Sequence, residues 1–358
     1  MRVIAAMSGG VDSSVAAAML RRAGHDALGV HLLLRPSAEG AGAARCLSPA
    51  HAEDARRAAE AAGIPFRTLA LEDCFEREII QPFLAAYQAG ETPNPCVWCN
   101  ARVKLGPLLQ WAKAEGYEAI STGHYARVRF DEVGGRWRLL RGRNRAKDQS
   151  YYLMGLSQEQ LAHLVLPLGE IEDKADTRQL AREWGLPVAE KAESQDICLV
   201  GGGDYRQFLE ARLGPGGAGT PGPIVNSRGE PMGRHHGLAR YTVGQRKGLG
   251  IAHARPLYVI ELRPESNTLV VGEEEELGKS RLVAREMNWV SIAPPREPLR
   301  AEGQIRYRHA PAPCVIHPRG PSEVEAIFDE PQRAVAPGQM AVFYEGEMLL
   351  GGGAIAKE

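Results

Sequence analysis

The feature that most constrains the fold is a short polar loop between an apolar segment and a helical segment near the amino end. Residues 2–7 are mostly apolar and predict a buried strand, and residues 13–23 predict a helix that Gly24 ends. The loop between them is part of the stretch MSGGVDSSVA at residues 7–16. A glycine-rich loop between a strand and a helix is where α/β folds hold phosphate, because backbone N–H groups and the helix amino end point at the anion.

The following segments continue the alternation of strand and helix. The apolar and amphipathic runs predict strands at 26–34, 66–72 and from 119 onward, and helices at 51–63 and 105–116. Strands that alternate with helices at this spacing pair in parallel, with the helices covering both faces of the sheet. We therefore predict an α/β fold with a doubly wound parallel sheet.

The pattern changes after about residue 200. A stretch rich in glycine and proline, GPGGAGTPGP at 214–223, is followed by short alternating apolar runs separated by turn residues. These runs predict two smaller β-rich domains, the last of them a β-barrel. We place the domains at residues 1–204, 205–280 and 281–358.

Charge and hydropathy narrow the choice of partners. The formal net charge of the 358-residue chain is −1, so any binding of a polyanion requires a local basic patch. Residues 127–147 contain eight Arg and Lys residues and only Asp131 and Glu132 as acids, which fits either a solvated hairpin around a Gly-Gly turn or a polyanion-binding surface. The chain contains no apolar run of about 18 residues and begins without a secretory signal peptide, so we expect a cytoplasmic protein with no membrane partner.

The loop at residues 8–13 differs from the common phosphate motifs. It contains no lysine, which excludes a Walker A loop, and it is not G-x-G-x-x-G. Its pattern Ser-Gly-Gly-x-Asp-Ser resembles the pyrophosphate loop of ATP pyrophosphatases, enzymes that adenylate a substrate and release pyrophosphate. The resemblance implies that Ser8–Ser13 bind the departing pyrophosphate and that Asp12 lies near a magnesium ion. The alternative is an ordinary strand–helix loop.

The six cysteines do not suggest a disulfide framework in an intracellular chain. Cys96 and Cys99 form a C-x-x-C pair, and Cys198 lies far along the chain in ESQDICLV. A C-x-x-C pair by itself fits a zinc site, a redox pair or part of an iron–sulfur site.

Several motifs together resemble one family. The segments SGGVDSS, TPNPCVWCN, STGHYAR, KDQSYYL, ESQDIC, YTVGQRKGLGIA and IRYRHAP occur in this order in tRNA-specific 2-thiouridylases. The resemblance extends from residue 3 to about residue 345. It implies an N-type ATP pyrophosphatase domain followed by two β-rich domains. It also implies a transferase that adenylates the C2 oxygen of uridine at tRNA wobble position 34 and then replaces AMP with sulfur carried on a cysteine.

The same resemblance assigns roles to individual residues. Cys99, Cys198 and Asp12 are the catalytic residues, with Cys99 as nucleophile and Cys198 as carrier of the persulfide. The ATP site comprises Ala6, Met7, Ser8, Gly9, Gly10, Val11, Asp12, Ser13, Leu32 and Gly123. Asn94, Pro95 and Cys96 face the target base, and the tRNA contacts are His124, Lys147, Asp148, Gln149, Arg306, Tyr307 and Gln339.

Cysteine at position 96 leaves two sulfur chemistries open. Many relatives have aspartate there, and with cysteine the three thiolates of Cys96, Cys99 and Cys198 would suit a [4Fe–4S] cluster whose fourth iron binds sulfide. The expected cofactors are ATP and Mg²⁺, with the cluster as the alternative to a persulfide.

The resemblance also implies partners. They are tRNAs for Lys, Glu and Gln, and a sulfur donor such as a cysteine desulfurase or a sulfur relay protein. The competing functions are another kind of ATP pyrophosphatase, such as an ammonia-using ligase, and a non-catalytic RNA-binding protein.

Overall fold

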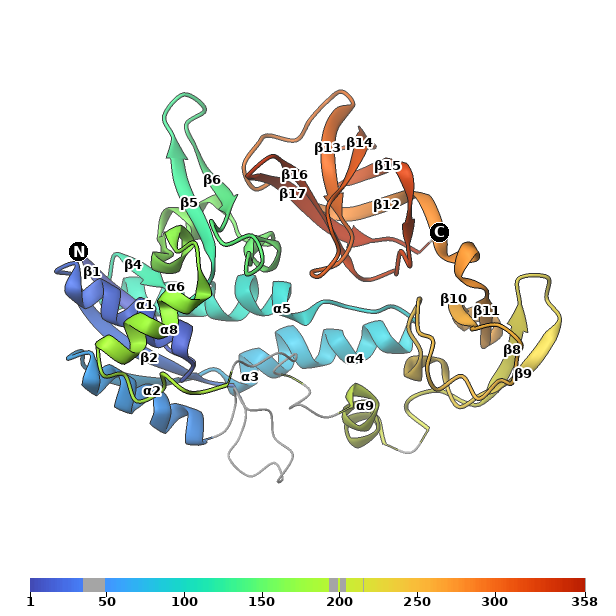
Figure 1. Ribbon diagram of the computed structural model, residues 1–358, viewed down its shortest axis with the longest axis horizontal. Coiled ribbons are helices and arrows are strands. Elements are labelled where there is room, and N and C mark those ends of the chain that lie inside the picture. Colours follow the sequence, from blue (N-terminus) through green and yellow to red (C-terminus); the bar gives the residue numbers. More distant parts are fainter. Residues whose placement is uncertain (35–48, 193–198, 200–203, 215, 358) are drawn as a thin grey trace.

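The computed structural model describes residues 1–34, 49–192, 199, 204–214 and 216–357. Figure 1 shows a domain built on the amino-terminal strands, a carboxyl-terminal barrel, and a small sheet between them in sequence. No helix of the described residues is long and apolar enough to cross a bilayer.

The first domain is built on a five-stranded parallel sheet in the order β3-β2-β1-β4-β7. Its strands are β1 (Arg2–Ala6), β2 (Asp26–Leu33), β3 (Phe66–Ala70), β4 (Ala119–Ser121) and β7 (Leu164–Val165). Because side chains alternate along a strand, Ile4 packs into the core on one face while Val3 and Ala5 pack into the core on the other. The predicted α/β class with a doubly wound parallel sheet is confirmed.

The helices of this domain cover both faces of the sheet, as Figure 1 shows. The α-helices described in this domain are α1 (Val11–Arg22), α2 (Pro49–Ala61), α3 (Glu72–Phe75), α4 (Gln81–Gln88), α5 (Pro95–Trp98), α6 (Pro107–Ala114), α7 (Gln158–Ala162) and α8 (Lys174–Glu183), and α9 (Tyr205–Leu213) follows them in the chain. The described part of this domain also contains two π-helical segments, η2 (Glu76–Ile80) and η3 (Cys99–Lys104), and two 3₁₀ segments, η4 (Ser150–Leu153) and η5 (Pro167–Glu170). The chain order reverses at β1, with β2 on one side and β4 on the other, and such a switch point is where open α/β sheets bind ligands.

The segment from residue 119 onward, which the sequence predicts to begin with one strand, forms two. It enters the parallel sheet as β4 and then leaves it to form a hairpin of β5 (Ala126–Asp131) and β6 (Arg136–Arg141). The break falls at Gly123, where an added Cβ atom would lie 2.6 Å from the backbone nitrogen of Ser13. The chain turns here because its backbone packs directly against the start of α1.

The central sheet has the order β10-β11-β8-β9. Its strands are β8 (Gly222–Asn226), β9 (Pro231–His235), β10 (Tyr258–Arg263) and β11 (Thr268–Gly272), with short 3₁₀ turns η6 (Leu238–Arg240), η7 (Pro264–Ser266) and η8 (Glu274–Leu277). Strands β8 and β11 pair in parallel, whereas the other pairs are antiparallel.

The last strands close into an antiparallel barrel of six strands within residues 278–355. They are β12 (Gly278–Asn288), β13 (Leu299–Gln304), β14 (Ala312–Pro318), β15 (Glu323–Arg333), β16 (Met340–Glu345) and β17 (Met348–Ile355). The hairpin β5–β6 extends the barrel sheet, because Leu139 and Leu140 of β6 pair with Leu349 and Met348 of β17. Residues of the amino-terminal half therefore belong to the same sheet as the carboxyl-terminal barrel, while the boundaries 1–204, 205–280 and 281–358 stay predictions.

Candidate active site

The loop after β1 forms a turn that only glycine fits at its second position. Gly9 has φ 75°, and an added Cβ atom would lie 2.3 Å from the carbonyl oxygen of His51. The hydroxyl of Ser13 accepts a hydrogen bond from the backbone N–H of Ser8 at 3.1 Å, and the two serine hydroxyls lie 3.1 Å apart. No side chain caps α1 at Gly10, so the amino end of this 12-residue helix is open to an anion at the carboxyl end of β1.

The predicted nucleotide-binding residues gather around this loop. Met7 and Val11 are buried beside it, and Ala6 is partly exposed at the end of β1. The backbone of Gly123 packs directly against the backbone of Asp12 and Ser13. Leu32 lies partly exposed on the neighbouring strand β2, which runs parallel to β1.

Lysine is absent from the loop sequence, but the tertiary structure brings Lys191 to it. The Lys191 ammonium donates hydrogen bonds to the carbonyl oxygen of Gly9 at 2.8 Å, to Nδ1 of His51 at 2.9 Å and to Oδ2 of Asp54 at 2.6 Å. It therefore ties the loop to helix α2. Burial lowers the pKa of the nearby His31, whose Nδ1 lies 2.8 Å from the carbonyl oxygen of Met7, and the charge of Lys191 lowers it further.

A second lysine lies at the predicted metal-binding residue. Lys174, the first residue of α8, pairs with Oδ1 of Asp12, and the same oxygen accepts a hydrogen bond from the Tyr125 hydroxyl at 3.1 Å. The Tyr125 hydroxyl also lies 2.8 Å from the hydroxyl of Thr177 on α8. Sequence reasoning missed both lysines, because 162 and 182 positions separate them from their partners at the loop and no local motif marks them.

This arrangement fits a polyphosphate. The open helix end, the serine hydroxyls and two ammonium groups are all groups that bind phosphate oxygens. The carboxylate of Asp12 is a ligand type that Mg²⁺ prefers. The residues present therefore fit a magnesium–nucleotide complex.

Cys99 begins a π-helical segment directly after the short helix α5. Single π-helical turns are rare and occur frequently at functional sites. Cys99 is 4% exposed and packs in a cluster that includes Phe75, Ile79 and Leu34. Leu34 directly follows β2, so this cluster lies at the carboxyl edge of the parallel sheet, the edge at which the loop after β1 begins.

Cys198 lies outside the described residues. Its sequence neighbour Leu199 is 1% exposed and belongs to the cluster that contains Cys99. Within the described ranges no group of three His, Cys, Asp or Glu side chains could hold a metal ion. Because the third predicted cysteine ligand is not described, the fit of an iron–sulfur cluster stays a prediction.

The two tyrosines of KDQSYYL, to which the sequence assigned no role, connect the cysteine segment to the barrel. Asn94 forms a side-chain hydrogen bond with Tyr151, and Cys96 is one of the groups that raise the pKa of Tyr152, after burial as the main cause. The ring of Tyr307 packs on that of Tyr152 with centroids 4.2 Å apart. Asn94 and Cys96, which are predicted to face the target base, and Tyr307, a predicted tRNA contact, therefore all interact with the tyrosine pair Tyr151 and Tyr152.

A second contact holds the cysteine segment against the barrel. The backbone N–H of Thr92 donates to the carbonyl oxygen of Pro337 at 2.8 Å, and Nε2 of Gln339 donates to the carbonyl oxygen of Thr92 at 3.1 Å. Pro95 is buried three residues further along the same segment. Arg306 donates to the carbonyl oxygen of Arg333 at 3.0 Å on the barrel side.

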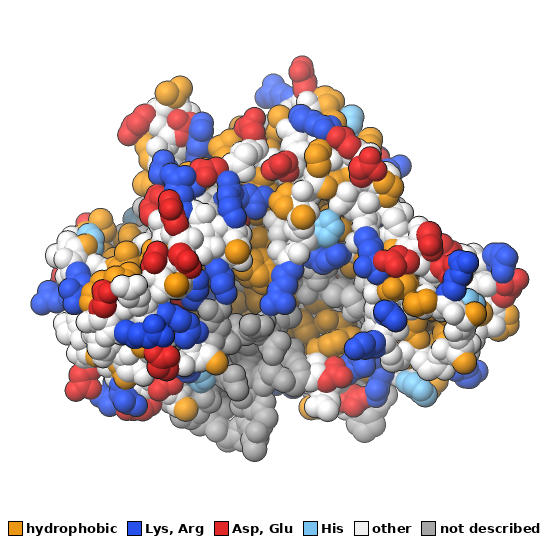
Figure 2. All heavy atoms as spheres, in the orientation of Figure 1, with side chains coloured by type: hydrophobic (Ala, Val, Ile, Leu, Met, Phe, Trp, Pro, Cys, Tyr) orange, Lys and Arg blue, Asp and Glu red, His pale blue; other side chains and the backbone are white. Residues whose placement is uncertain are grey.

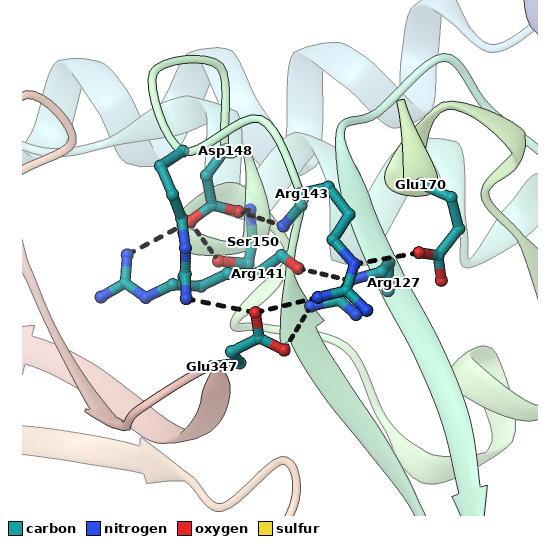
Figure 3. A network of polar contacts seen from close by, with 9 residues as sticks. Arg127, Arg141, Arg143, Asp148, Ser150, Glu170 and Glu347 are labelled. Carbon is teal, nitrogen blue, oxygen red and sulfur yellow. Dashed lines mark hydrogen bonds and ion pairs between the residues drawn. The ribbon is translucent and has the colours of Figure 1, made fainter. Parts of the chain in front are cut away.

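The loop after β6 contains three predicted tRNA contacts in different settings. Lys147 is partly exposed, and the side-chain oxygen of Gln149 accepts from the backbone N–H of Tyr125 at 3.1 Å. Asp148 is 8% exposed, and its carboxylate accepts from Arg141, from the backbone N–H of Gly142, and from the N–H and hydroxyl of Ser150 (Figure 3). We interpret Asp148 as a residue that positions its neighbours.

His124 stays neutral at physiological pH. Burial, with a further contribution from Lys104, lowers its pKa to about 3. Its Nδ1 lies 2.8 Å from the hydroxyl of Thr122. A neutral imidazole next to Gly123 can exchange hydrogen bonds with RNA but does not attract phosphate by charge.

The fold and the site define an α/β domain with a parallel sheet and a loop whose groups fit phosphate, joined to two β-rich domains. The profile described as the tRNA methyl transferase HUP domain matches residues 1–202, the tRNA methyl transferase PRC-barrel domain matches 206–273, and the aminomethyltransferase beta-barrel domain matches 279–355.

Two curated relatives match nearly the whole chain. The tRNA-specific 2-thiouridylase MnmA of Moorella thermoacetica is 47% identical over 352 residues, which cover 98% of each chain. The protein of the same name from Nostoc punctiforme is 47% identical over 356 residues, covering 99% of this chain and 98% of the relative. The chain belongs to the family of tRNA-specific 2-thiouridylases.

Solved structures with lower similarity also match. An NMN synthetase from Francisella tularensis has 19% identity and a TM-score of 0.34, and the match covers 60% of this chain and 76% of that one. A 4-thiouridine synthetase in complex with RNA and ATP has 14% identity and a TM-score of 0.32, with 59% and 50% covered.

Proposed function

We propose that the protein is a tRNA sulfurtransferase that uses ATP to thiolate C2 of uridine 34. The observation that carries this proposal is the position of Cys99 at the carboxyl edge of the parallel sheet, the edge that also bears the Ser8–Ser13 loop. A sulfur-transferring thiol and a phosphate loop at one edge can act on the same atom of a bound base.

The first step makes the C2 oxygen a leaving group. The oxygen attacks the α-phosphorus of ATP, an O–P bond forms, the bond between the α-phosphorus and its bridging oxygen breaks, and pyrophosphate departs with the electron pair. The amino end of α1 and the ammonium of Lys174 stabilise the charge of the departing pyrophosphate. Lys191 holds the loop in place through Gly9, and a magnesium ion beside Asp12 would neutralise further phosphate charge.

The second step replaces the oxygen with sulfur. The terminal sulfur of a persulfide on Cys198 attacks C2, and AMP leaves with the C–O electron pair. The Cys99 thiolate then attacks the inner sulfur of Cys198, which forms a disulfide and releases the thiouridine sulfur as an anion. An external thiol reductant returns both cysteines to the reduced state. The burial of Leu199 in the cluster of Cys99 supports an encounter of the two cysteines.

Sulfide bound to a [4Fe–4S] cluster on Cys96, Cys99 and Cys198 is the alternative to the persulfide. Iron and sulfide analysis after oxygen-free purification separates the two chemistries. Three or four irons per chain favour the cluster, and protein that thiolates tRNA without iron favours the persulfide.

The remaining parts of the proposal concern recognition and partners. The target base has to leave the anticodon stack to reach the cysteine segment, and Tyr152, Tyr307 and Trp98 offer aromatic rings near that segment. A cysteine desulfurase or relay protein as sulfur donor, tRNAs for Lys, Glu and Gln as substrates, and a cytoplasmic location stay predictions.

Mass analysis of tRNA nucleosides tests the function directly. The protein is incubated with ATP, Mg²⁺, a sulfide source and unmodified tRNA, and 2-thiouridine at position 34 is the expected product. Pyrophosphate release should require tRNA that carries a wobble uridine. Release without any tRNA would favour an ammonia-using ligase, and tRNA binding without ATP consumption would favour a non-catalytic RNA-binding protein.

A further inference from the structure

Arginines of the β5–β6 hairpin and of the loop that follows it form a network in which cations outnumber carboxylates. Within the part of the chain that the structure describes, five guanidinium groups pair with three carboxylates, those of Asp148, Glu170 and Glu347. The guanidinium groups are those of Arg127, Arg129, Arg141, Arg143 and Arg145. Figure 3 shows Glu347 in contact with several of them, on the turn between β16 and β17.

Two of these arginines have internal roles. Arg127 is 3% exposed and donates to the carbonyl oxygen of Arg141 and to Glu347, both at 2.8 Å. Arg141 is buried, pairs with Asp148 at 3.2 Å and lies 3.5 Å from the centroid of the Tyr344 ring. These contacts hold the hairpin to the barrel, together with the pairing of β6 with β17.

Arg143 and Arg145 are more exposed than Arg127 and Arg141, and their contacts with Glu347 are longer than that of Arg127. Their side chains are 40% and 50% exposed, and each reaches Glu347 only at 3.4 Å, beyond the usual range for a charge-assisted hydrogen bond. Arg143 also contacts Glu170 at 3.2 Å, but Glu170 pairs with Arg129 at the same distance. The carboxylates that Arg143 and Arg145 contact thus also pair with Arg127 or Arg129. The guanidinium groups of Arg143 and Arg145 can therefore still donate hydrogen bonds to another anion.

The position of these side chains suggests what the anion is. They lie two to four residues before Lys147, and Lys147 and Gln149 are predicted tRNA contacts on the same loop. On the face shown in Figure 2, Lys and Arg side chains border the hollow between the first domain and the barrel. A guanidinium group matches the geometry of a phosphate with two parallel hydrogen bonds.

We infer that Arg143 and Arg145 form a binding site for backbone phosphates of tRNA, and that Glu347 and Glu170 hold these arginines in the absence of RNA. This inference rests on the proposed function. A phosphate that arrives takes over the long contacts of Arg143 and Arg145, while Glu347 keeps its short contact with Arg127. The carboxylates thereby keep the arginines oriented and prevent them from binding other anions tightly.

Equilibrium binding of unmodified tRNA to the full chain over a series of salt concentrations tests the inference. The double variant Arg143→Ala/Arg145→Ala should bind tRNA at least about tenfold more weakly at low salt, and the slope of log K against log salt should fall by about 1 to 2. Glu170→Gln should strengthen binding by up to about fivefold, because it removes one competing carboxylate from an exposed pair. ATP binding reports that each variant is folded.

Matched controls separate a local effect from a general change of charge. Arg228→Ala removes an exposed arginine that pairs with Glu230 in the central sheet, and it should leave tRNA affinity unchanged. Arg143→Lys/Arg145→Lys keeps the charge and should restore the salt slope but only part of the affinity, since lysine lacks the planar fork. If the double alanine variant binds tRNA with unchanged affinity and slope, the inference is overturned while the proposed function stands. If the unaltered protein does not bind tRNA, both are overturned.

Discussion

The ammonium group of Lys191 donates a hydrogen bond to the carbonyl oxygen of Gly9 over 2.8 Å, although 182 positions separate the two residues. The lysine lies in the segment that leads toward Cys198, and the glycine lies in the loop proposed to bind pyrophosphate. The Lys191 side chain thus connects the segment before Cys198 to the loop at residues 8–13, and the proposed reaction depends on both. Its contacts with Asp54 and His51 fix the loop against α2 at the same time.

Replacing Lys191 with methionine should weaken ATP binding. The loss of a charged hydrogen bond to the loop predicts an affinity about tenfold to a hundredfold lower, because Gly9 would no longer be held in its left-handed conformation by its carbonyl contact. Isothermal titration with ATP and Mg²⁺ measures this. Lys113→Met, which removes a surface pair with Glu159, is the control and should bind ATP normally. Equal affinities of both variants would show that the lysine does not support the loop.

The two proposed chemical steps should respond differently to two substitutions. Asp12→Ala should reduce tRNA-dependent exchange of pyrophosphate into ATP by at least about a hundredfold, because it removes the carboxylate beside the phosphates. Cys198→Ala should keep this exchange and stop 2-thiouridine formation. Asp26→Ala, which removes an exposed partner of Arg2, should change neither activity. Loss of both steps in the Cys198 variant would contradict the division of labour.

Acidification should destabilise the protein well above the range in which carboxylates titrate. The pKa of His124 is about 3 in the folded protein, whereas a histidine of the unfolded chain has a pKa of about 6.5. The unfolded state therefore binds a proton between these values and the folded state does not. The stabilisation is complete above about pH 6.5 and is lost as the pH falls, by up to about 1.4 kcal/mol per pH unit.

Chemical denaturation between pH 7.5 and 5 measures this dependence. His124→Gln should lower the slope, since one of the histidines with a depressed pKa is then missing. His31 and His235, whose pKa values are also lowered by burial, account for part of the slope that remains. An identical slope in the parent and in the variant would show that the His124 environment does not disfavour protonation.

Gly338 should be a more sensitive position than other turn glycines of the barrel. It has φ 85°, and an added Cβ atom would lie 2.9 Å from both the Cβ of Glu91 and the backbone nitrogen of Thr92. Gly338→Ala should destabilise the protein through backbone strain of about 1 to 2 kcal/mol and through overpacking of roughly 1 to 3 kcal/mol more.

Gly346 provides the matched control for this effect. It has φ 57°, and nothing lies within 4 Å of an added Cβ atom. Gly346→Ala should therefore show the strain alone. Thermal unfolding measures the Tm of both variants. An equal fall in Tm for Gly338→Ala and Gly346→Ala would mean that the contact between the cysteine segment and the barrel is not tightly packed.

The sequence predicted the parts of the structure that depend on local pattern. The apolar periods marked strands β1 to β4 and helices α1, α2 and α6, but they did not mark α3 to α5, α7, β7 or α8. The glycines and serines marked the loop after β1, and the ordered motifs indicated the family to which the chain belongs. These features could be predicted because each arises from residues that are close along the chain. The roles of individual site residues, including Cys99 and Asp12, stay predictions.

The tertiary structure alone decided which distant groups meet. It brought Lys174 and Lys191 to a loop without lysine, packed the ring of Tyr152 against that of Tyr307, and joined the hairpin β5–β6 to the barrel through two residue pairs. Such contacts depend on how whole domains pack, and no periodicity along the chain encodes the partner of a side chain more than a hundred residues away. The local sequence determined which helices and strands form. The burial of their apolar faces against one another determined which charged side chains, such as Lys174 and Lys191, come to lie beside the loop after β1.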